Sequence, residues 1–370
     1  MRTHIERPIL YIDYLQHIER AVGVTYSFNN FDEVGLDNRD FYGFRPSGKQ
    51  KRVVFNPDGA SFGINFNKPI PAKFFANVNY VALFGHNFAS NNIIFKLTAT
   101  DTNGISRVFW SSVAGDTMSI NAGTTTWVTD PIAGLQYDNF SIISVLPDNV
   151  EIVSLEFEIN SPIESFNDDA QLTLDISSIS IGQSFLFPHS VDLASSVAFM
   201  HDGIKVKQTP MGRDLIQSTW THPPNHGDFV PFQLYHGAGS MPNLEIARRS
   251  GRAEFNFQVS FFSDTQLIPK FNLPHDTVGT DIAHGHTPVL DSTIADGTMS
   301  GGSDLGTLLN IFTYGGNLPM MLCANSENKH ENGWIKTDSF YIVRNEDKGF
   351  EYKPVAPDLY NMSFKLVETW

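Results

Sequence analysis

The sequence predicts an all-β protein, and three features of its 370 residues support this. Phenylalanine is the most conspicuous apolar residue, with 30 copies, and aromatic and β-branched side chains favour pleated, half-buried strands. The 28 glycines and 20 prolines supply frequent turns. Many short segments alternate apolar and polar residues with a period of two, which is typical of antiparallel strands with one face on a core.

The first predicted element is an N-terminal arm that ends in a short helix, over residues 1–22. Four apolar residues recur there at helical spacing, and the pattern stops at the segment GVTYSFNN. These residues are Ile12, Leu15, Ile18 and Val22. We expect this arm to contact other subunits.

Residues 23–181 are predicted to form a β-sandwich or jelly roll. Segment 93–99 places Ile93, Phe95, Leu97 and Ala99 on one face, and segment 154–159 does the same with Leu155, Phe157 and Ile159. The run YVALFG, residues 80–85, shows no alternation, so we expect a central strand covered on both faces. His86 follows this strand and is predicted to satisfy backbone groups at a turn.

The pattern changes over residues 182–200, and a domain boundary is predicted near Gly182. In the second domain, 182–370, segment 253–262 is expected to place Phe255, Phe257, Val259 and Phe261 on one face. Residues 275–303 form a long loop rich in Gly, Thr and Asp, which we expect to contact a partner. A short helix follows, capped by Ser303 or Asp304, with Leu305, Leu308, Leu309 and Phe312 on one face.

The charge and cysteine content exclude several functions. The formal net charge of −15 disfavours a nucleic-acid surface and docking on anionic lipid. A single cysteine, Cys323, excludes an intrachain disulfide and a cysteine-based zinc site. The first residues lack the apolar core of a signal peptide, and no apolar segment is long enough for a membrane-spanning helix. We therefore expect synthesis in a cytoplasm without Sec-type export, and no cofactor.

Two groups of polar residues are candidates for metal binding or subunit contact. His222, His226 and Asp228 could hold a metal, but Pro223 and Pro224 forbid the helix that would align the histidines, so a stiff interface loop is preferred. The second group is expected at an interface between subunits, where arginines would meet a neighbour's carboxylates. It consists of Arg248, Arg249 and Arg252 before a strand and His284 and His286 in the long loop.

A carbohydrate site and an active site complete the candidates. Trp110 and Trp127 could form an aromatic platform for a sugar, although a place in the sandwich core is preferred for both. The chain carries no G-x-S-x-G motif and no phosphate-binding glycine loop, so an enzyme is not expected. A hydrolase using an acidic pair such as Asp168 and Asp169 is the least favoured alternative.

Five segments follow one another within residues 200–370: GIKVKQTPMGR, RRSGRAEFNFQVSFFSDTQLIP, TYGGNLPMML, SFYIVRN and a terminal LYNMSFKLVETW. The order of these segments resembles that in a group of tailed-bacteriophage virion proteins. The segment LPMML and Phe255 depart from that group, where aromatic residues and a tryptophan are usual. This half is also similar, more distantly, to tail-tube and distal-tail β-barrels. The first half resembles the galactose-binding-like jelly rolls attached to tail and baseplate proteins.

The resemblance implies a structural role in a virion. We expect a ring-forming tail, baseplate or tail-adaptor subunit that packs against copies of itself and against other virion proteins. One alternative is a tail fibre or adaptor that binds a glycan or receptor on the host surface. A second alternative is a capsid decoration protein with the same sandwich architecture.

Overall fold

The computed structural model describes most of the predicted strands. The described residues are 5–29, 53–55, 60–70, 78–84, 86, 88, 93–112, 117–120, 123–126, 140–145, 150–160, 174–176, 178–200, 204–218, 252–267, 305–329, 333, 335, 339–347 and 349–369. The long loop 275–303 and the capping residues Ser303 and Asp304 lie outside them.

The prediction of an all-β protein is confirmed. The helical elements are short: α1 (Leu15–Ala21), α3 (Asp264–Leu267), α5 (Leu305–Thr307) and the π-helical turn η3 (Leu308–Phe312). The strands are β1 (Ile9–Asp13), β2 (Val24–Asn29), β3 (Val53–Phe55), β4 (Ala60–Ile70), β5 (Tyr80–Phe84), β6 (Ile94–Asp101), β7 (Ser106–Ser111), β8 (Thr117–Ile120), β9 (Gly123–Thr126), β10 (Phe140–Ser144), β11 (Ile152–Asn160), β12 (Leu174–Ile176), β13 (Ser178–Leu186), β14 (Ser196–Met200), β15 (Ile204–Gln208), β16 (Asp214–Ser218), β17 (Arg252–Ser263), β18 (Met320–Cys323), β19 (Phe340–Asn345), β20 (Glu351–Ala356) and β21 (Leu359–Glu368).

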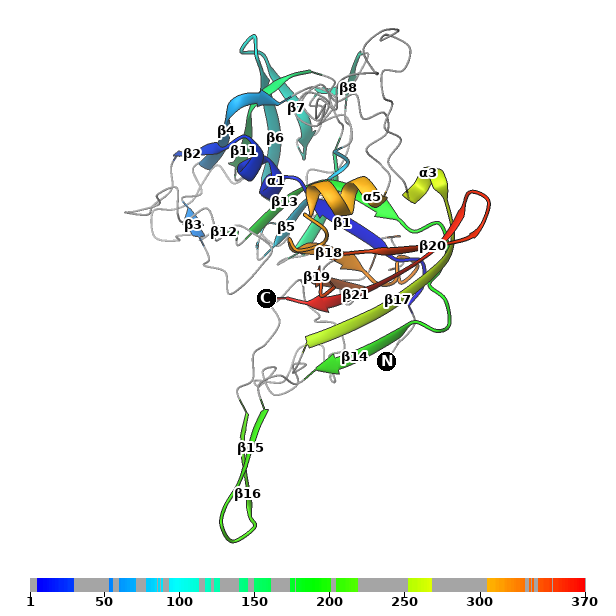
Figure 1. The fold of residues 1–370 in the computed structure, drawn as a ribbon. Coiled ribbons are helices and arrows are strands. Elements are labelled where there is room, and N and C mark those ends of the chain that lie inside the picture. The colour runs from blue at the N-terminus through cyan, green and yellow to red at the C-terminus, as the bar shows by residue number, and fades with distance from the viewer. Residues whose placement is uncertain are drawn as a thin grey trace, which may run out of the picture.

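Two antiparallel sheets organise the molecule (Figure 1). The larger has ten strands in the order β10-β5-β13-β1-β18-β19-β21-β17-β14, with β20 attached to β21. The smaller has five strands in the order β2-β4-β11-β6-β7. The apolar faces of both sheets contribute to one hydrophobic core cluster, so the first half is a β-sandwich as predicted.

The alternating segments of the first half occupy this core as expected. Phe95 and Leu97 on β6 and Phe157 on β11 are fully buried, and Phe157 stacks on Phe62 with ring centroids 4.5 Å apart. Strand β5 is buried on both faces, because Val81 and Leu83 join this core while Tyr80, Ala82 and Phe84 join a second cluster. The prediction for the run YVALFG is therefore confirmed.

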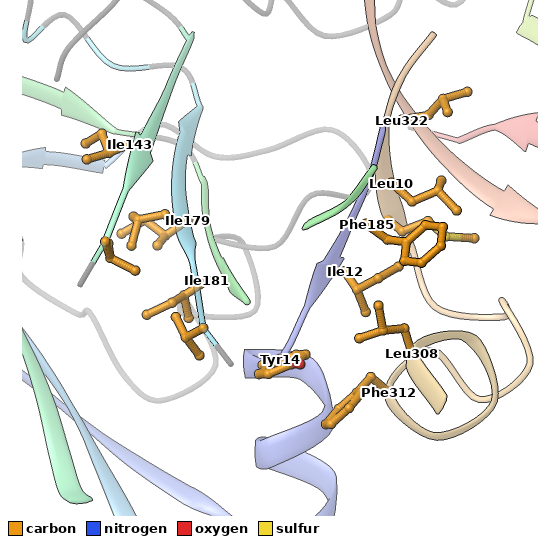
Figure 2. Packing of buried hydrophobic residues seen from close by; sticks show 14 of the residues in the cluster. Leu10, Ile12, Tyr14, Ile143, Ile179, Ile181, Phe185, Leu308, Phe312 and Leu322 are labelled. Atoms are coloured by element: carbon orange, nitrogen blue, oxygen red, sulfur yellow. The ribbon is translucent and has the colours of Figure 1, made fainter. Parts of the chain in front are cut away.

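The prediction of a separate N-terminal arm is wrong for residues 9–13. Residues 9–13 form β1, which pairs with β13 on one side and β18 on the other, inside the large sheet. Leu10 and Ile12 are fully buried and pack beside Phe185, Leu308 and Leu322 (Figure 2). Only the short helix, α1, was predicted correctly. The segment ILYID is buried on both faces, so it lacks the alternation that identifies a strand.

The domain boundary predicted near Gly182 falls inside a strand. β13 runs from Ser178 to Leu186, and Gly182 pairs with both Asp13 and Tyr80. A Cβ atom at Gly182 would lie 1.9 Å from the carbonyl oxygen of Ile12, so this crossing requires glycine. The large sheet passes from the first half to the second without interruption at this point.

The pattern predicted for β17 changes at one residue. Phe255, Phe257 and Val259 face the core, but Phe261 is 60% exposed and Phe262 is buried in its place. The register with β21 shifts between Val259 and Phe262, and Phe261 has a φ of 63°. A bulge of this kind moves the following side chain to the opposite face.

The predicted helix in the second half is shorter and differently wound. It begins at Leu305 and continues from Leu308 as the π-helical turn η3. All four residues expected on its apolar face are nevertheless buried, and Phe312 stacks on Tyr14 at 4.2 Å between ring centroids (Figure 2). The wider turn still presents one continuous apolar surface to β1 and α1.

Candidate functional site

The main candidate site is a β-hairpin, β15–β16, that projects from the body of the protein (Figure 1). The strands Ile204–Gln208 and Asp214–Ser218 pair only with each other among the described residues. The turn begins at Thr209, whose carbonyl accepts from the Gly212 N–H at 2.8 Å. Pro210 supplies a preset φ at the second turn position, and Gly212 adopts a φ of 80°.

One face of the hairpin carries an exposed apolar pair, next to the polar pair Gln208 and Asp214. Val206 and Ile216 are directly opposite each other, so their side chains lie on the same face. They are 58% and 69% exposed, and Met211 in the turn is 97% exposed. A cross-strand pair of β-branched residues normally stabilises a sheet by packing under another layer, and no described element forms such a layer over this pair.

The other face of the hairpin is basic. Lys205 and Lys207 alternate with Val206, so they point to the opposite side, together with Leu215 and Gln217. With Arg213 and Asp214 in the turn region, the hairpin has a formal charge of +2, which leaves −17 on the rest of the chain. The hairpin is therefore a cationic, partly apolar projection from an acidic protein.

This hairpin is not among the sites predicted from the sequence. The segments IKVKQ, TPMGR and DLIQS do indicate a β-hairpin, because a turn with Pro and Gly separates two alternating segments. The same alternation also describes a strand that rests on a core. The tertiary structure shows that the hairpin lies apart from the core that the described residues form.

His86 is the clearest candidate for catalysis in the described residues, and its hydrogen bonds assign it a structural role. Its Nε2 lies 3.0 Å from Ser141 Oγ, which is the spacing of a nucleophile and its base. The backbone N–H of Phe88 donates to His86 Nδ1 at 3.1 Å, so the neutral ring carries its proton on Nε2 and donates it to Ser141. A ring in this tautomer cannot accept the serine proton, and both side chains are fully buried. The prediction that His86 satisfies a backbone group is confirmed by its bond with Phe88.

A buried polar seam lies where β1, β13 and β5 meet. Tyr14 donates to Gln183 Oε1 at 2.8 Å, and the Tyr80 and Ser180 hydroxyls are 2.9 Å apart. Asp13 Oδ1 accepts from the backbone of Leu15 at 3.1 Å. Burial, and secondarily the charge of Asp13, raises the pKa of Tyr80 well above its usual range. This phenol stays protonated near neutral pH, and the hydrogen bonds of the seam join neighbouring strands.

The glycine turn that contributes to the virion resemblance is also explained by packing. Tyr314, Gly315 and Gly316 all have positive φ angles, and the carbonyl of Gly316 accepts from the Asn345 N–H at 2.7 Å. A Cβ atom at Gly316 would lie 2.5 Å from Asn345 Cβ. The Asn345 side chain donates to the carbonyls of Asp347 and Gly349 at 2.8 and 3.2 Å. The glycine turn therefore allows residues 314–316 to pack closely against Asn345 at the end of β19.

The remaining sequence-based candidates divide into two groups. Trp110 is 3% exposed and packs in the sandwich core, so it cannot form the proposed aromatic platform for a glycan; the preferred core position is correct. Arg252 is the first residue of β17, half-buried and in register with Met200. The others lie outside the described residues: Trp127, His222, His226, Asp228, Arg248, Arg249, His284 and His286.

Two further properties of the described residues limit the possible sites. No three His, Cys, Asp or Glu side chains in this part of the chain cluster closely enough to hold a metal ion. No helix in the same residues has the length and hydropathy required to cross a bilayer.

Comparisons with known proteins give only partial structural likenesses. No protein-family model and no curated protein matches the chain. Among solved structures, CpGH89CBM32-4 produced by Clostridium perfringens is 15% identical, with a TM-score of 0.25 over 47% of this chain and 100% of its own. The C-terminal domain of a chitobiase from Bacteroides fragilis is 9% identical, with a TM-score of 0.26 over 44% and 95%. A pectin-binding carbohydrate-binding module is 12% identical, with a TM-score of 0.23 over 43% and 88%. Likenesses at this level assign neither a family nor a ligand to this chain.

Proposed function

We propose that this protein is a non-catalytic structural subunit that assembles with copies of itself. The observation that carries the proposal is the projecting hairpin β15–β16, whose apolar pair Val206 and Ile216 is exposed in the single chain. A two-stranded hairpin alone is marginally stable in water, and it needs a further layer or neighbouring strands. A neighbouring subunit supplies that cover.

The virion is the setting that we propose for this assembly. The support is the resemblance of residues 200–370 to tailed-phage structural proteins, together with the hairpin, whose segment GIKVKQTPMGR is part of that resemblance. In this setting the subunit is a ring-forming component of a tail, baseplate or tail adaptor. Its partners are copies of itself and other virion proteins.

The self-assembly proposal is tested by sedimentation of the purified chain over a range of concentrations. The wild-type protein should form an oligomer, and the double variant Val206→Asp/Ile216→Asp should weaken the association constant at least tenfold, because two charges then face the partner. The melting temperature of the body should not change, since the hairpin lies outside its core. The matched control is Val355→Asp, another exposed valine in a strand. A wild-type chain that is monomeric at all concentrations would overturn the proposal.

The virion setting has its own test, by detection of the protein in purified particles. Its absence from particles would refute this part of the proposal and leave self-assembly untouched. Glycan binding by the monomer would instead favour the receptor-binding alternative. A copy number in the hundreds per particle would favour capsid decoration.

A further inference from the structure

The second exposed feature in this part of the molecule is the edge strand β14. Ser196–Met200, with the sequence SVAFM, is the last strand of the ten-stranded sheet, and no described strand pairs with its outer side. Four of its five residues are exposed. It contains no charged residue and no proline, which are the usual features that prevent an edge from pairing with another chain.

The backbone of Val197 points toward the open side of β14. On β17 the Ala253 N–H donates to Glu368 on β21, away from β14, whereas the Gln258 N–H donates to Ser195 just before β14. Backbone groups alternate in direction along a strand, so Glu254 and its partner Ala198 bond to each other across the pair. The neighbouring residue, Val197, therefore directs its N–H and C=O outward, where an added strand would bind.

The two faces of this edge match the two faces of the hairpin. Val197 is opposite the buried Phe255 and packs against the core, so this side of the added strand should be apolar. Ala198 is opposite Glu254 on the other face. There, Lys365 joins Glu254 at 2.9 Å and Glu346 at 2.6 Å, and Arg252 lies on the same face of β17 as Glu254, so this face is charged and polar. A hairpin with Val206 and Ile216 on the core side would place Lys205 and Lys207 on this polar side, which includes Glu254.

We infer that the hairpin β15–β16 of one copy adds as two strands to the open edge of β14 in a second copy. The hairpin does not cover its own edge, because it extends away from the body (Figure 1). A second copy is the favoured partner because the rest of the chain carries −17 and the hairpin +2. This inference rests on the proposed self-assembly and names the surface that receives the hairpin.

The symmetry of the contact follows from chain order. β14 ends at Met200 and β15 begins at Ile204, so each copy presents its hairpin and its open edge close together. Two copies related by a two-fold axis can then exchange hairpins reciprocally and close the contact. Such a contact gives a closed dimer. Larger rings would then form from dimers through other surfaces.

The test compares two substitutions at Val197 in the full chain. Val197→Pro removes the outward N–H but no hydrogen bond to β17, since that residue donates to the open side. Val197→Ala removes two methyl groups of the side chain and keeps the N–H, so it controls for the loss of valine packing. Sedimentation should show at least tenfold weaker association for the proline variant than for the alanine variant, with similar melting temperatures. Equal association of the two variants would overturn the inference.

A crosslinking experiment tests the partner surfaces directly. Ala198→Cys and Gln217→Cys are prepared in separate copies, mixed, and treated with a short thiol–thiol crosslinker; the native Cys323 is fully buried. Crosslinked dimers are expected in the mixture, and far fewer when Ser106→Cys on the exposed end of β7 replaces Gln217→Cys. An oligomer that gives no such crosslink and tolerates Val197→Pro would reject this contact and leave the proposed self-assembly standing. A monomeric wild-type chain would reject both.

Discussion

At the scale of single residues, the direction of its hydrogen bonds decides the role of His86. His86 and Ser141 are as close as a catalytic pair, yet the Phe88 N–H occupies Nδ1 and leaves Nε2 as a donor. A base needs a lone pair directed at the nucleophile. The sequence predicted a turn residue at this position, and the geometry supplies the reason.

His17 on α1 is the residue at which stability should depend on pH. Its ring is buried against Phe312 and Tyr314, and burial lowers its pKa below the usual value. Below about pH 6.5 the unfolded chain then binds a proton that the folded chain does not. Stability should fall as pH decreases from about 6.5 toward the lowered pKa, by at most ~1.4 kcal/mol per pH unit.

The measurement is chemical denaturation of the wild type and His17→Gln between pH 5 and 8. The variant should lack the part of the slope that His17 contributes, so the difference between the two proteins should shrink as the pH falls. His189→Gln, at an exposed histidine, should follow the wild-type profile. Parallel profiles for the wild type and His17→Gln would contradict the assignment.

At the scale of elements, β1 is the strand that connects the two halves of the chain. It lies between β13 and β18, which are separated by more than a hundred residues in the sequence. Its apolar side chains on one face belong to the core, and Tyr11 on the other face joins the second cluster with Tyr80. An element in this position stabilises the sheet and is not available as a detachable arm.

The substitution Leu10→Ala should therefore destabilise the whole protein. Removing a fully buried leucine from a packed site costs about 2–5 kcal/mol of unfolding free energy. Leu186→Ala, at an exposed leucine on the neighbouring strand β13, should cost less than about 0.5 kcal/mol. Urea denaturation measures both. A loss of unfolding free energy for Leu10→Ala as small as that for Leu186→Ala would contradict the place of residues 9–13 in the core sheet and support the predicted arm.

At the scale of the whole molecule, the large sheet continues from one half of the chain into the other. A cut after Ile181 would divide β13 and would also remove β18, which covers the far side of β1. The fragment 1–181 should therefore lack a cooperative thermal transition. Circular dichroism during heating measures this, with the full chain as the control. A sharp transition in the fragment would show that the sandwich is an independent unit.

Local sequence patterns were sufficient to predict the all-β class, the burial of β5 on both faces and the apolar faces of β6 and β11. These follow from local periodicity, because a side chain's direction along a strand depends only on its position. The strand β1, the bulge at Phe261 and the edge position of β14 were decided only by the tertiary structure. Strand order, register shifts and the presence or absence of a covering layer depend on segments far apart in the chain. The hairpin β15–β16 illustrates the difference. Its alternating sequence is equally compatible with a strand that packs on a core, whereas in the structure its apolar pair is exposed.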